Sequence, residues 1–302
     1  MTANDLPFAA WAKELQDRME LVLGNQLPTA QHIPARLHES MRYATLGGGK
    51  RVRPLLTFAA AELVNGQPDT VGIVAASLEM IHAYSLVHDD LPAMDNDVLR
   101  RGKPTCHIAF DEATALLAGD ALQTQAFILL TRLPLSAAQS IMQVKLLAEA
   151  SGSAGMAGGQ AIDLASVGKP LTLPELEQMH IMKTGALIRA AVRMGAHCEP
   201  DAQSALDEHA HAQLDKYAQK IGLAFQVVDD ILDVEADSTT LGKTAGKDAA
   251  ADKPTYVSLM GLSDAKKMAR ELHAEAHDAL VGFGDKARRL KELADYIVLR
   301  TY

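Results

Sequence analysis

The sequence has 302 residues, of which 48% are hydrophobic and 22% charged, a composition typical of a soluble globular protein with a sizeable core. Proteins that bind nucleic acids in general have a basic surface, whereas this chain has a formal net charge of −9. We therefore expect no nucleic-acid partner. Two cysteines, Cys106 and Cys198, are too few for a disulfide framework or a zinc site, which favours a reducing compartment.

The N-terminal segment lacks the basic and apolar regions of a secretory signal. There is also no stretch of about 20 uninterrupted apolar residues of the kind that spans a membrane. We therefore expect a cytoplasmic protein without stable membrane insertion.

Helical periodicity runs through nearly the whole sequence, and strand-like alternation is scarce. Asp69-Thr70 predicts the cap of a helix that runs into residues 88–90, and Pro92 predicts the end of regular helix. A second helix is expected over 108–130, with an interruption midway at Gly119-Asp120.

The second half of the chain is also predicted to be helical. Thr172-Leu-Pro174-Glu175 is a capping box with proline in the first turn, so a helix is expected from there to about Met194. One long helix is expected over 202–234, and two amphipathic helices near 263–281 and 285–300. Because composition does not change between the halves, we expect a single all-α domain over residues 1–302.

Acidic side chains gather at two places beside apolar helical sequence. The two clusters are His88-Asp89-Asp90 with Asp95 close behind, and Asp229-Asp230-Ile-Leu-Asp233. The proline turn is expected to bring Asp95 back to Asp89. On a helix, Asp229 and Asp233 lie on one face, with Asp230 about 100° around. Two like charges about 4 Å apart repel by roughly 4 kcal/mol at an effective dielectric near 20, so we expect Mg²⁺ shared with a phosphorylated substrate.

Basic residues accompany the acidic clusters. A glycine-rich turn that ends at Gly49 leads through Lys50 to Arg53 at a helix start, a combination that suits an anion. Arg100 and Arg101 follow the first acidic cluster so closely that contact with the same substrate is expected. Weaker candidates come later in the chain: Lys183, Thr184, Gln226, Lys243 and Lys253.

The histidines have both ordinary and functional interpretations. His82 lies seven residues before Asp89, on roughly the same helix face, so it is either a phosphate donor or a satisfied core histidine. His88-Asp89 alone would fit an HD-type metal phosphohydrolase. That class of enzyme needs an earlier histidine ligand and leaves the second acidic cluster unexplained.

The order of these motifs resembles that of the trans-polyprenyl diphosphate synthases, and most of all their bacterial farnesyl type. The resemblance covers about residues 30–260. It rests on GGKRVRP at 48–54, His82, HDDLPAMDNDVLRRGKPT at 88–105, GDAL at 119–122, GGQAID at 158–163, KTG at 183–185, FQVVDDILD at 225–233 and GKTAGKD at 242–248.

The resemblance implies an isoprenoid synthase helical bundle around a central cavity, usually a homodimer, with the acidic clusters facing each other across the cavity mouth. It implies that Asp89 and Asp95 hold two Mg²⁺ ions and Asp229 a third, supported by Asp90 and Asp233. Asp230 and Lys183 complete the expected catalytic set.

The same resemblance implies two diphosphate sites. The allylic diphosphate is expected at Arg100, Lys183, Thr184, Gln226, Lys243 and Lys253, and that of isopentenyl diphosphate at Gly49, Lys50, Arg53, His82 and Arg101. The C-terminal residues from Arg300 onward are less basic than the tails of several relatives and are given no role.

The expected reaction joins isopentenyl diphosphate to dimethylallyl or geranyl diphosphate, giving a fifteen-carbon product. Tyr84, five residues before Asp89, is expected to form the cavity floor, although Ser85 or a neighbouring helix is an alternative. A geranylgeranyl diphosphate synthase remains the alternative within the family. A terpene cyclase would lack the Lys50, Arg53 and His82 set, and a non-catalytic partner subunit would lose acidic ligands.

Overall fold

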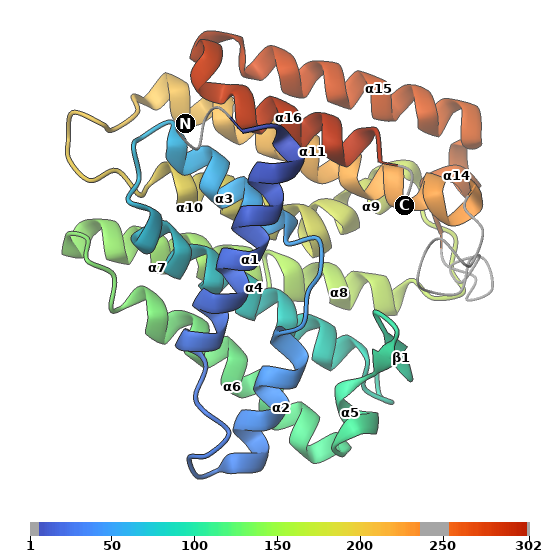
Figure 1. Cartoon of the computed structure of the whole chain (residues 1–302). Coiled ribbons are helices and arrows are strands. Elements are labelled where there is room, and N and C mark those ends of the chain that lie inside the picture. Colours follow the sequence, from blue (N-terminus) through green and yellow to red (C-terminus); the bar gives the residue numbers. More distant parts are fainter. Residues whose placement is uncertain (1–5, 236–253, 301–302) are drawn as a thin grey trace.

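The computed structural model describes residues 6–235 and 254–300, and within these ranges the chain is a bundle of α-helices (Figure 1). The helices of the first half are α1 (Phe8–Gln26), α2 (Ala35–Thr45), α3 (Val52–Glu62), α4 (Pro68–Asp89), α5 (Cys106–Ala109), α6 (Glu112–Leu130) and α7 (Ala137–Ser151). Those of the second half are α8 (Met156–Ala165), α9 (Leu173–His180), the π-helix η2 (Ile181–Gly185), α10 (Ala186–Ala196), α11 (Glu208–Glu235), α14 (Tyr256–Met260), α15 (Leu262–Ala279), the 3₁₀-helix η3 (Val281–Ala287) and α16 (Arg288–Val298). The expected all-α fold is confirmed.

The strands of the described part are short. β1 (Leu99–Arg100) and β2 (Lys103–Pro104) pair antiparallel just after the first acidic cluster. Arg101 and Gly102, which connect them, both have positive φ. This hairpin turns the chain back so that Arg100 lies beside the end of α4.

Helix α4 is the central element of the bundle and packs against α1, α3, α6 and α10. It is apolar on every side, as expected of a helix surrounded by others, and Pro68 begins it with Asp69 in the first turn. Asp89 is the last residue of this helix, so the packing of α4 fixes the position of Asp89 at the edge of the hydrophobic core.

Two helices, α4 and α6, have the length and hydropathy of a membrane span. In α4, 78% of the most apolar 18-residue window is buried inside the protein, which is the property of a core helix. In α6 the buried share is 39%, because one face carries exposed Leu116 and Leu117.

Four sequence-based boundaries were wrong. The N-cap of α4 is Gln67, with no side-chain hydrogen bond, and not Asp69-Thr70. Helix α6 continues without interruption through Gly119 and Asp120. A Cβ on Gly119 would lie 2.1 Å from His88 Nε2, so this glycine permits close packing of α4 on α6 and breaks nothing. The predicted helix over 108–130 is two, because α5 ends at Ala109 and Asp111 caps α6 through the amide of Thr114. Helix α11 begins at Glu208, where Asp207 accepts from the amide of Ala210 at 2.7 Å.

The helices of the second half follow their sequence signals more closely. The capping box at Thr172 and Glu175 is present and begins α9. The helical path continues to Ala196 but includes the π-turn η2, which the sequence did not predict. The two amphipathic segments form α15 and α16, which pack on each other and on α11 at one edge of the bundle (Figure 1).

Candidate active site

A cavity of about 500 Å³ opens beside the end of α4. Helices α4, α6 and α8 and the π-helix η2 contribute its wall, which is apolar along much of its length. The lining residues include Tyr84, Ser85, Leu86, Asp89, Met94, Gln123, Met156, Ala161, Leu164, Lys183 and Thr184. Such a cavity suits a hydrocarbon chain that carries a charged group at one end.

The first acidic cluster lies at this cavity. Asp89 ends α4 and lines the cavity, and the amide of Asp95 donates to the carbonyl oxygen of Asp89 at 2.8 Å. The turn after Pro92 thus returns Asp95 to Asp89, as the sequence predicted. The two carboxylates are close enough for the charge of Asp95 to raise the pKa of Asp89.

The electrostatics of Asp89 indicate a site prepared for a cation. Burial raises the pKa of this carboxyl to about 6, although Lys183 and Arg100 act against the rise and Asp95 and Asp90 add to it. A carboxylate with these neighbours is stabilised in its ionised form by additional positive charge.

Asp90 has a different environment. It is 3% exposed, and its carboxylate accepts hydrogen bonds from Arg100. The Nε of Arg100 lies 2.9 Å from both carboxylate oxygens, and a terminal guanidinium nitrogen lies 2.7 Å from Oδ1. Burial raises the pKa of Asp90 against the opposing effect of Arg100. Asp90 therefore positions Arg100 at the cluster, and Arg100 is a paired cation here.

The second acidic cluster lies near the C-terminal end of α11, and its three carboxylates diverge. Asp229 accepts from Arg300 at 2.6 Å. Asp230 is buried and accepts from the amide of Tyr256 at 2.7 Å, so it caps the first turn of α14. Asp233 is also buried, at 9% exposure.

A second cavity, of about 490 Å³, adjoins the first, and Arg53 and His82 line both. Gly49, Lys50 and Arg101 line the second cavity as well. Gly49 has φ +124°, and a Cβ there would lie 2.9 Å from a guanidinium nitrogen of Arg101, so glycine allows the arginine to approach. The five residues expected at the isopentenyl site are thus brought together.

The charges around this second cavity favour an anion. Burial lowers the pKa of Arg53, and the Nε of its guanidinium is buried without a hydrogen-bond partner. Burial, followed by the charges of Arg53 and Arg101, holds the pKa of His82 well below its ordinary value. The guanidinium of Arg53 and the imidazole of His82 can therefore both donate hydrogen bonds to a phosphate.

Arg51, within the same basic segment, has a structural environment. It is buried at 4% exposure and bonds to Glu20 and Glu79, both at 2.5 Å. It also donates to the carbonyl oxygen of Thr45 at 2.8 Å. Its guanidinium is therefore used in holding the glycine-rich turn to α1 and α4.

The later cations and amides are only partly gathered at the cavity. Lys183 and Thr184 lie on η2 at the cavity wall, and Lys183 pairs with Asp163 of α8 at 2.6 Å. A Cβ on Gly159 would lie 2.1 Å from the amide nitrogen of Lys183, so this glycine lets α8 meet η2 closely. Gln226 bonds to Nδ1 of His180 at 3.1 Å and does not line the described cavity. Lys243 and Lys253 lie outside the described residues.

Tyr84 and Ser85 both line the first cavity. The Tyr84 ring is mostly buried and meets the His88 ring edge-on, with 5.6 Å between the ring centroids. Burial raises the pKa of its hydroxyl, and the neighbouring side chain of Gln123 in α6 acts against the rise. The Ser85 hydroxyl instead donates to the carbonyl oxygen of His82 at 2.8 Å.

No function was predicted from the sequence for three residues that lie at the site. Arg300 contacts Asp229, Asp163 pairs with Lys183, and both polar atoms of the Gln160 amide are buried without partners at the cavity. Gln160 and Asp163 are three residues apart on α8, on one face, which is a signal that the sequence contained. Nothing local to Arg300 indicated its contact.

An all-α bundle with an apolar cavity, carboxylates at its opening and buried cations beside it defines a class of enzyme that acts on a hydrocarbon diphosphate. The polyprenyl synthetase family model matches residues 34–290, so the chain belongs to this family of prenyl transferases. The resemblance seen in the sequence is thereby confirmed.

Curated relatives and solved structures agree with this membership. The farnesyl diphosphate synthase of Haemophilus influenzae is 47% identical over 296 residues, covering 97% of this chain and 98% of the relative. That of Escherichia coli is 51% identical over 268 residues, covering 87% and 88%. The geranyltransferase of Helicobacter pylori, solved in complex with magnesium and isoprenyl diphosphate, is similar with a TM-score of 0.84 at 35% identity, covering 98% and 97% of the two chains.

Proposed function

We propose that this protein is a farnesyl diphosphate synthase, which joins isopentenyl diphosphate to dimethylallyl or geranyl diphosphate. The observation that carries the proposal is the apolar cavity that has Asp89 at its opening and Tyr84 in its wall, joined to a second, basic cavity at Arg53 and His82. The first cavity suits the allylic chain and the second suits the diphosphate of the other substrate. Relatives of that name at about half identity support it.

The reaction is magnesium-dependent, and the residues present fit the metal. Asp89 and Asp95 would hold two Mg²⁺ ions and Asp229 a third, with Asp233 and Asp90 in support. Carboxylate oxygens are the ligands that Mg²⁺ prefers, and the raised pKa of Asp89 supports a positive charge at this position. When bound, Mg²⁺ neutralises the diphosphate that leaves the allylic carbon.

The protein residues position and shield the reactants. Lys183 and Arg100, beside Asp89, would hold the allylic diphosphate with Thr184 and Gln226, and Lys243 and Lys253 belong to the same proposed set. Lys50, Arg53, His82 and Arg101, with the turn at Gly49, would hold isopentenyl diphosphate. The carbon–oxygen bond of the allylic diphosphate breaks and its electron pair leaves with the diphosphate. The alkene of isopentenyl diphosphate then forms the new carbon–carbon bond to the allylic cation, and the resulting cation gives a proton to the released diphosphate.

The apolar wall excludes water, which would otherwise capture the allylic cation. Tyr84 would close the cavity at the length of a fifteen-carbon chain. The second candidate is a geranylgeranyl diphosphate synthase, because enzymes of that name are also among the relatives.

One assay tests the function. The protein is mixed with isopentenyl and dimethylallyl diphosphates and Mg²⁺, and the products are identified by mass. A fifteen-carbon diphosphate supports the proposal, and a twenty-carbon product supports the second candidate. No condensation at all would contradict both.

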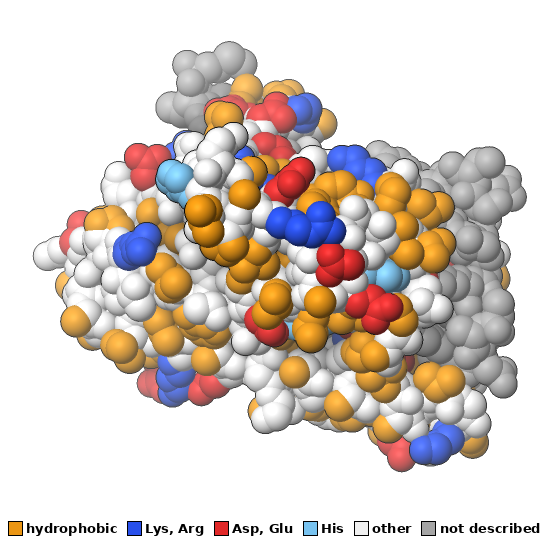
Figure 2. All heavy atoms as spheres, turned by 90° about the horizontal axis from the view of Figure 1, so that it is seen from below, with side chains coloured by type: hydrophobic (Ala, Val, Ile, Leu, Met, Phe, Trp, Pro, Cys, Tyr) orange, Lys and Arg blue, Asp and Glu red, His pale blue; other side chains and the backbone are white. Residues whose placement is uncertain are grey.

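We further propose a cytoplasmic homodimer of single-domain subunits that pack through α6. Leu116 and Leu117 of this helix are 48% and 55% exposed, so α6 presents adjacent large apolar side chains to the surface. Apolar side chains are spread over much of the face in Figure 2, which looks from the side on which α2 and α6 lie in Figure 1. Light scattering on Leu116→Glu, expected to give monomers, tests the interface.

A further inference from the structure

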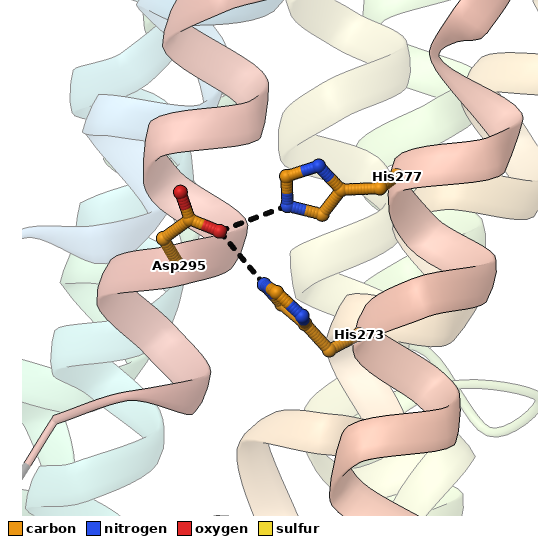
Figure 3. Close-up of side chains that lie close together, drawn as sticks. All are labelled: His273, His277 and Asp295. Atoms are coloured by element: carbon orange, nitrogen blue, oxygen red, sulfur yellow. Dashed lines mark hydrogen bonds and ion pairs between the residues drawn. The ribbon is translucent and has the colours of Figure 1, made fainter.

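Two histidines and an aspartate meet between α15 and α16 (Figure 3). His273 and His277 lie one turn apart on α15, and Asp295 faces them from α16. The Nε2 atoms of the two histidines lie 2.7 and 2.9 Å from the same oxygen, Oδ1 of Asp295. The three ligand atoms lie within 4.8 Å of one another.

Asp295 is contacted by the two histidines. Among the described residues, no Lys or Arg forms an ion pair with it. Lys291, four residues earlier on α16, instead donates to the carbonyl oxygen of Gly284 at 3.3 Å. The side chains of His273, His277 and Asp295 are 25%, 32% and 46% exposed, so an ion and water can reach all three.

We propose that His273, His277 and Asp295 form a binding site for a transition-metal ion of the Zn²⁺ class. Histidines at i and i+4 on a helix project from one face, and a carboxylate from a second element completes a three-ligand site with water in the fourth position. Neither histidine lines the cavities at Asp89 and Arg53, so this site is distinct from the catalytic one.

The geometry needs only a small adjustment. Tetrahedral Zn²⁺, with bonds of about 2.0–2.1 Å, separates its ligand atoms by about 3.3 Å. The two nitrogens would therefore move away from Oδ1 by about half an ångström, which side-chain rotation supplies. The Nε2 atoms that now donate to the carboxylate would bind the ion instead, so in the metal-bound state each imidazole would carry its proton on Nδ1.

Two histidines and one carboxylate form a ligand set that disfavours Mg²⁺, the metal proposed for catalysis. Imidazole nitrogen suits Zn²⁺, Co²⁺ and Ni²⁺, whereas Mg²⁺ prefers oxygen ligands alone. A bound ion would fasten α15 to α16, which ends two residues before Arg300.

Cobalt is the most direct probe, because four-coordinate Co²⁺ with histidine ligands absorbs strongly in the visible range and six-coordinate Co²⁺ with oxygen ligands absorbs weakly. The untagged full chain, kept in excess Mg²⁺, is titrated with CoCl₂. We expect one strongly absorbing ion per chain, with the same signal in Asp89→Asn. His277→Gln and Asp295→Asn should each weaken binding at least tenfold.

Two controls separate a metal site from a simple hydrogen-bonded contact. His209→Ala removes an exposed histidine from α11 and should keep the signal. His277→Gln retains a donor toward Asp295, so its Tm in chelator should stay close to that of the parent. Added ZnCl₂ should raise the parent Tm by about 2–5 °C and leave that of His277→Gln unchanged. Absence of the strong absorption, or equal Co²⁺ affinity and equal Zn²⁺ stabilisation in both proteins, would overturn the proposal.

Discussion

The guanidinium of Arg300 donates to the carboxylate of Asp229 at 2.6 Å and stacks on the ring of Phe225, with 4.1 Å between its Cζ and the ring centroid. It also donates to the carbonyl oxygen of Phe225 at 3.0 Å, and its side chain is 5% exposed. Arg300 thus contacts the carboxylate that we propose as a metal ligand. A bound Mg²⁺ ion and Arg300 would compete for the charge of Asp229.

Replacing Arg300 by Gln should lower the Mg²⁺ concentration that gives half-maximal activity by about 3- to 10-fold. A hydrogen bond to a charged group contributes about 1.5–3 kcal/mol, and we expect a value below that range because Asp229 is 39% exposed and solvent screens the pair. The measurement is a Mg²⁺ titration of product formation. Arg288→Gln is the matched control, because it removes the same charge from the exposed side of α16. An unchanged or higher Mg²⁺ requirement in Arg300→Gln would rule out the competition.

The two acidic clusters give a second prediction. Activity should require Mg²⁺ or Mn²⁺, and Asp89→Ala and Asp229→Ala should each lower turnover on the order of 10²-fold or more, by analogy with the loss of one preorganised electrostatic group. Asp89→Ala should not lower the Tm, because it relieves crowding among carboxylates. Full activity in chelator would contradict the metal assignment.

Asp230→Ala is the comparison that separates folding from catalysis in the second cluster. Its carboxylate caps α14 through the amide of Tyr256, and a buried donor left without a partner costs about 1–3 kcal/mol. Its Tm should therefore fall below that of Asp229→Ala in the same thermal melt. Equal Tm values would mean that the contact with Tyr256 contributes nothing.

The two cavities predict a separation between the substrates. Arg53→Ala and His82→Ala should mainly raise the KM for isopentenyl diphosphate, by about 10- to 100-fold, since each removes a hydrogen bond to a charged phosphate. Steady-state kinetics with each substrate varied in turn measures the effect. Equal increases for both substrates would contradict the assignment of the basic cavity.

Arg100→Ala should mainly affect the allylic substrate, but the structure adds a complication. Removal of Arg100 leaves the buried carboxylate of Asp90 without its partner, which destabilises the protein. The double variant Asp90→Asn/Arg100→Ala removes that charge and should recover the lost Tm while the KM for the allylic substrate stays high. A KM that recovers together with the Tm would assign Arg100 to folding alone.

The buried imidazole of His180 predicts a pH dependence of stability. Burial lowers its pKa to about 4, and its Nδ1 accepts from the Gln226 amide, so protonation there would oppose a donor. Because this pKa lies below the ordinary value near 6.5, the unfolded chain takes up the proton first as the pH falls. The contribution is complete above about pH 6.5 and is lost progressively down to pH 4.

Urea unfolding of His180→Gln at pH 7 and pH 5 measures this contribution. The parent should lose more stability between the two pH values than the variant, with the full effect of His180 limited to about 3 kcal/mol at pH 4. His38→Gln, at a half-buried histidine of α2, serves as control. Equal losses in the parent and in His180→Gln would mean that His180 does not titrate in this way.

Local patterns predicted the features that depend on residues near one another in the chain. The capping box at Thr172 forms as expected, and the turn after Pro92 returns Asp95 to Asp89. The dipeptide Gly119-Asp120 misled the prediction, because glycine was taken as a helix break and is instead the contact point for His88 of another helix. Local periodicity does not show whether a glycine breaks a helix or lets a second helix pack closely against it.

Contacts between distant residues were the part that the sequence did not reveal. Arg300 and Asp229 are 71 positions apart, and only the packing of α16 on α11 brings them together. The divergence of Asp229 and Asp230 follows from the same cause, since helical geometry gives the angle between them but not which side meets α14. The π-turn at 181–185 lies against α8 at Gly159, a contact between segments that local periodicity does not show.

The length of the product gives the last prediction. Tyr84 lies in the wall of the first cavity, five residues and more than one helical turn before Asp89, so a chain anchored at Asp89 extends past it. Tyr84→Ala should shift the product to twenty carbons or more while turnover persists, because the space of the ring becomes available to the growing chain. Mass analysis of the products measures the shift.

Two variants serve as controls for Tyr84→Ala. Tyr84→Phe removes only the hydroxyl and keeps the ring, so its product should retain fifteen carbons. Ser85→Ala changes the neighbouring wall residue by one oxygen atom and should also leave the length unchanged. If Tyr84→Ala still makes only the fifteen-carbon product, the floor lies on a neighbouring helix. If Tyr84→Phe lengthens the product as well, the hydroxyl, and not the bulk of the ring, sets the depth of the cavity.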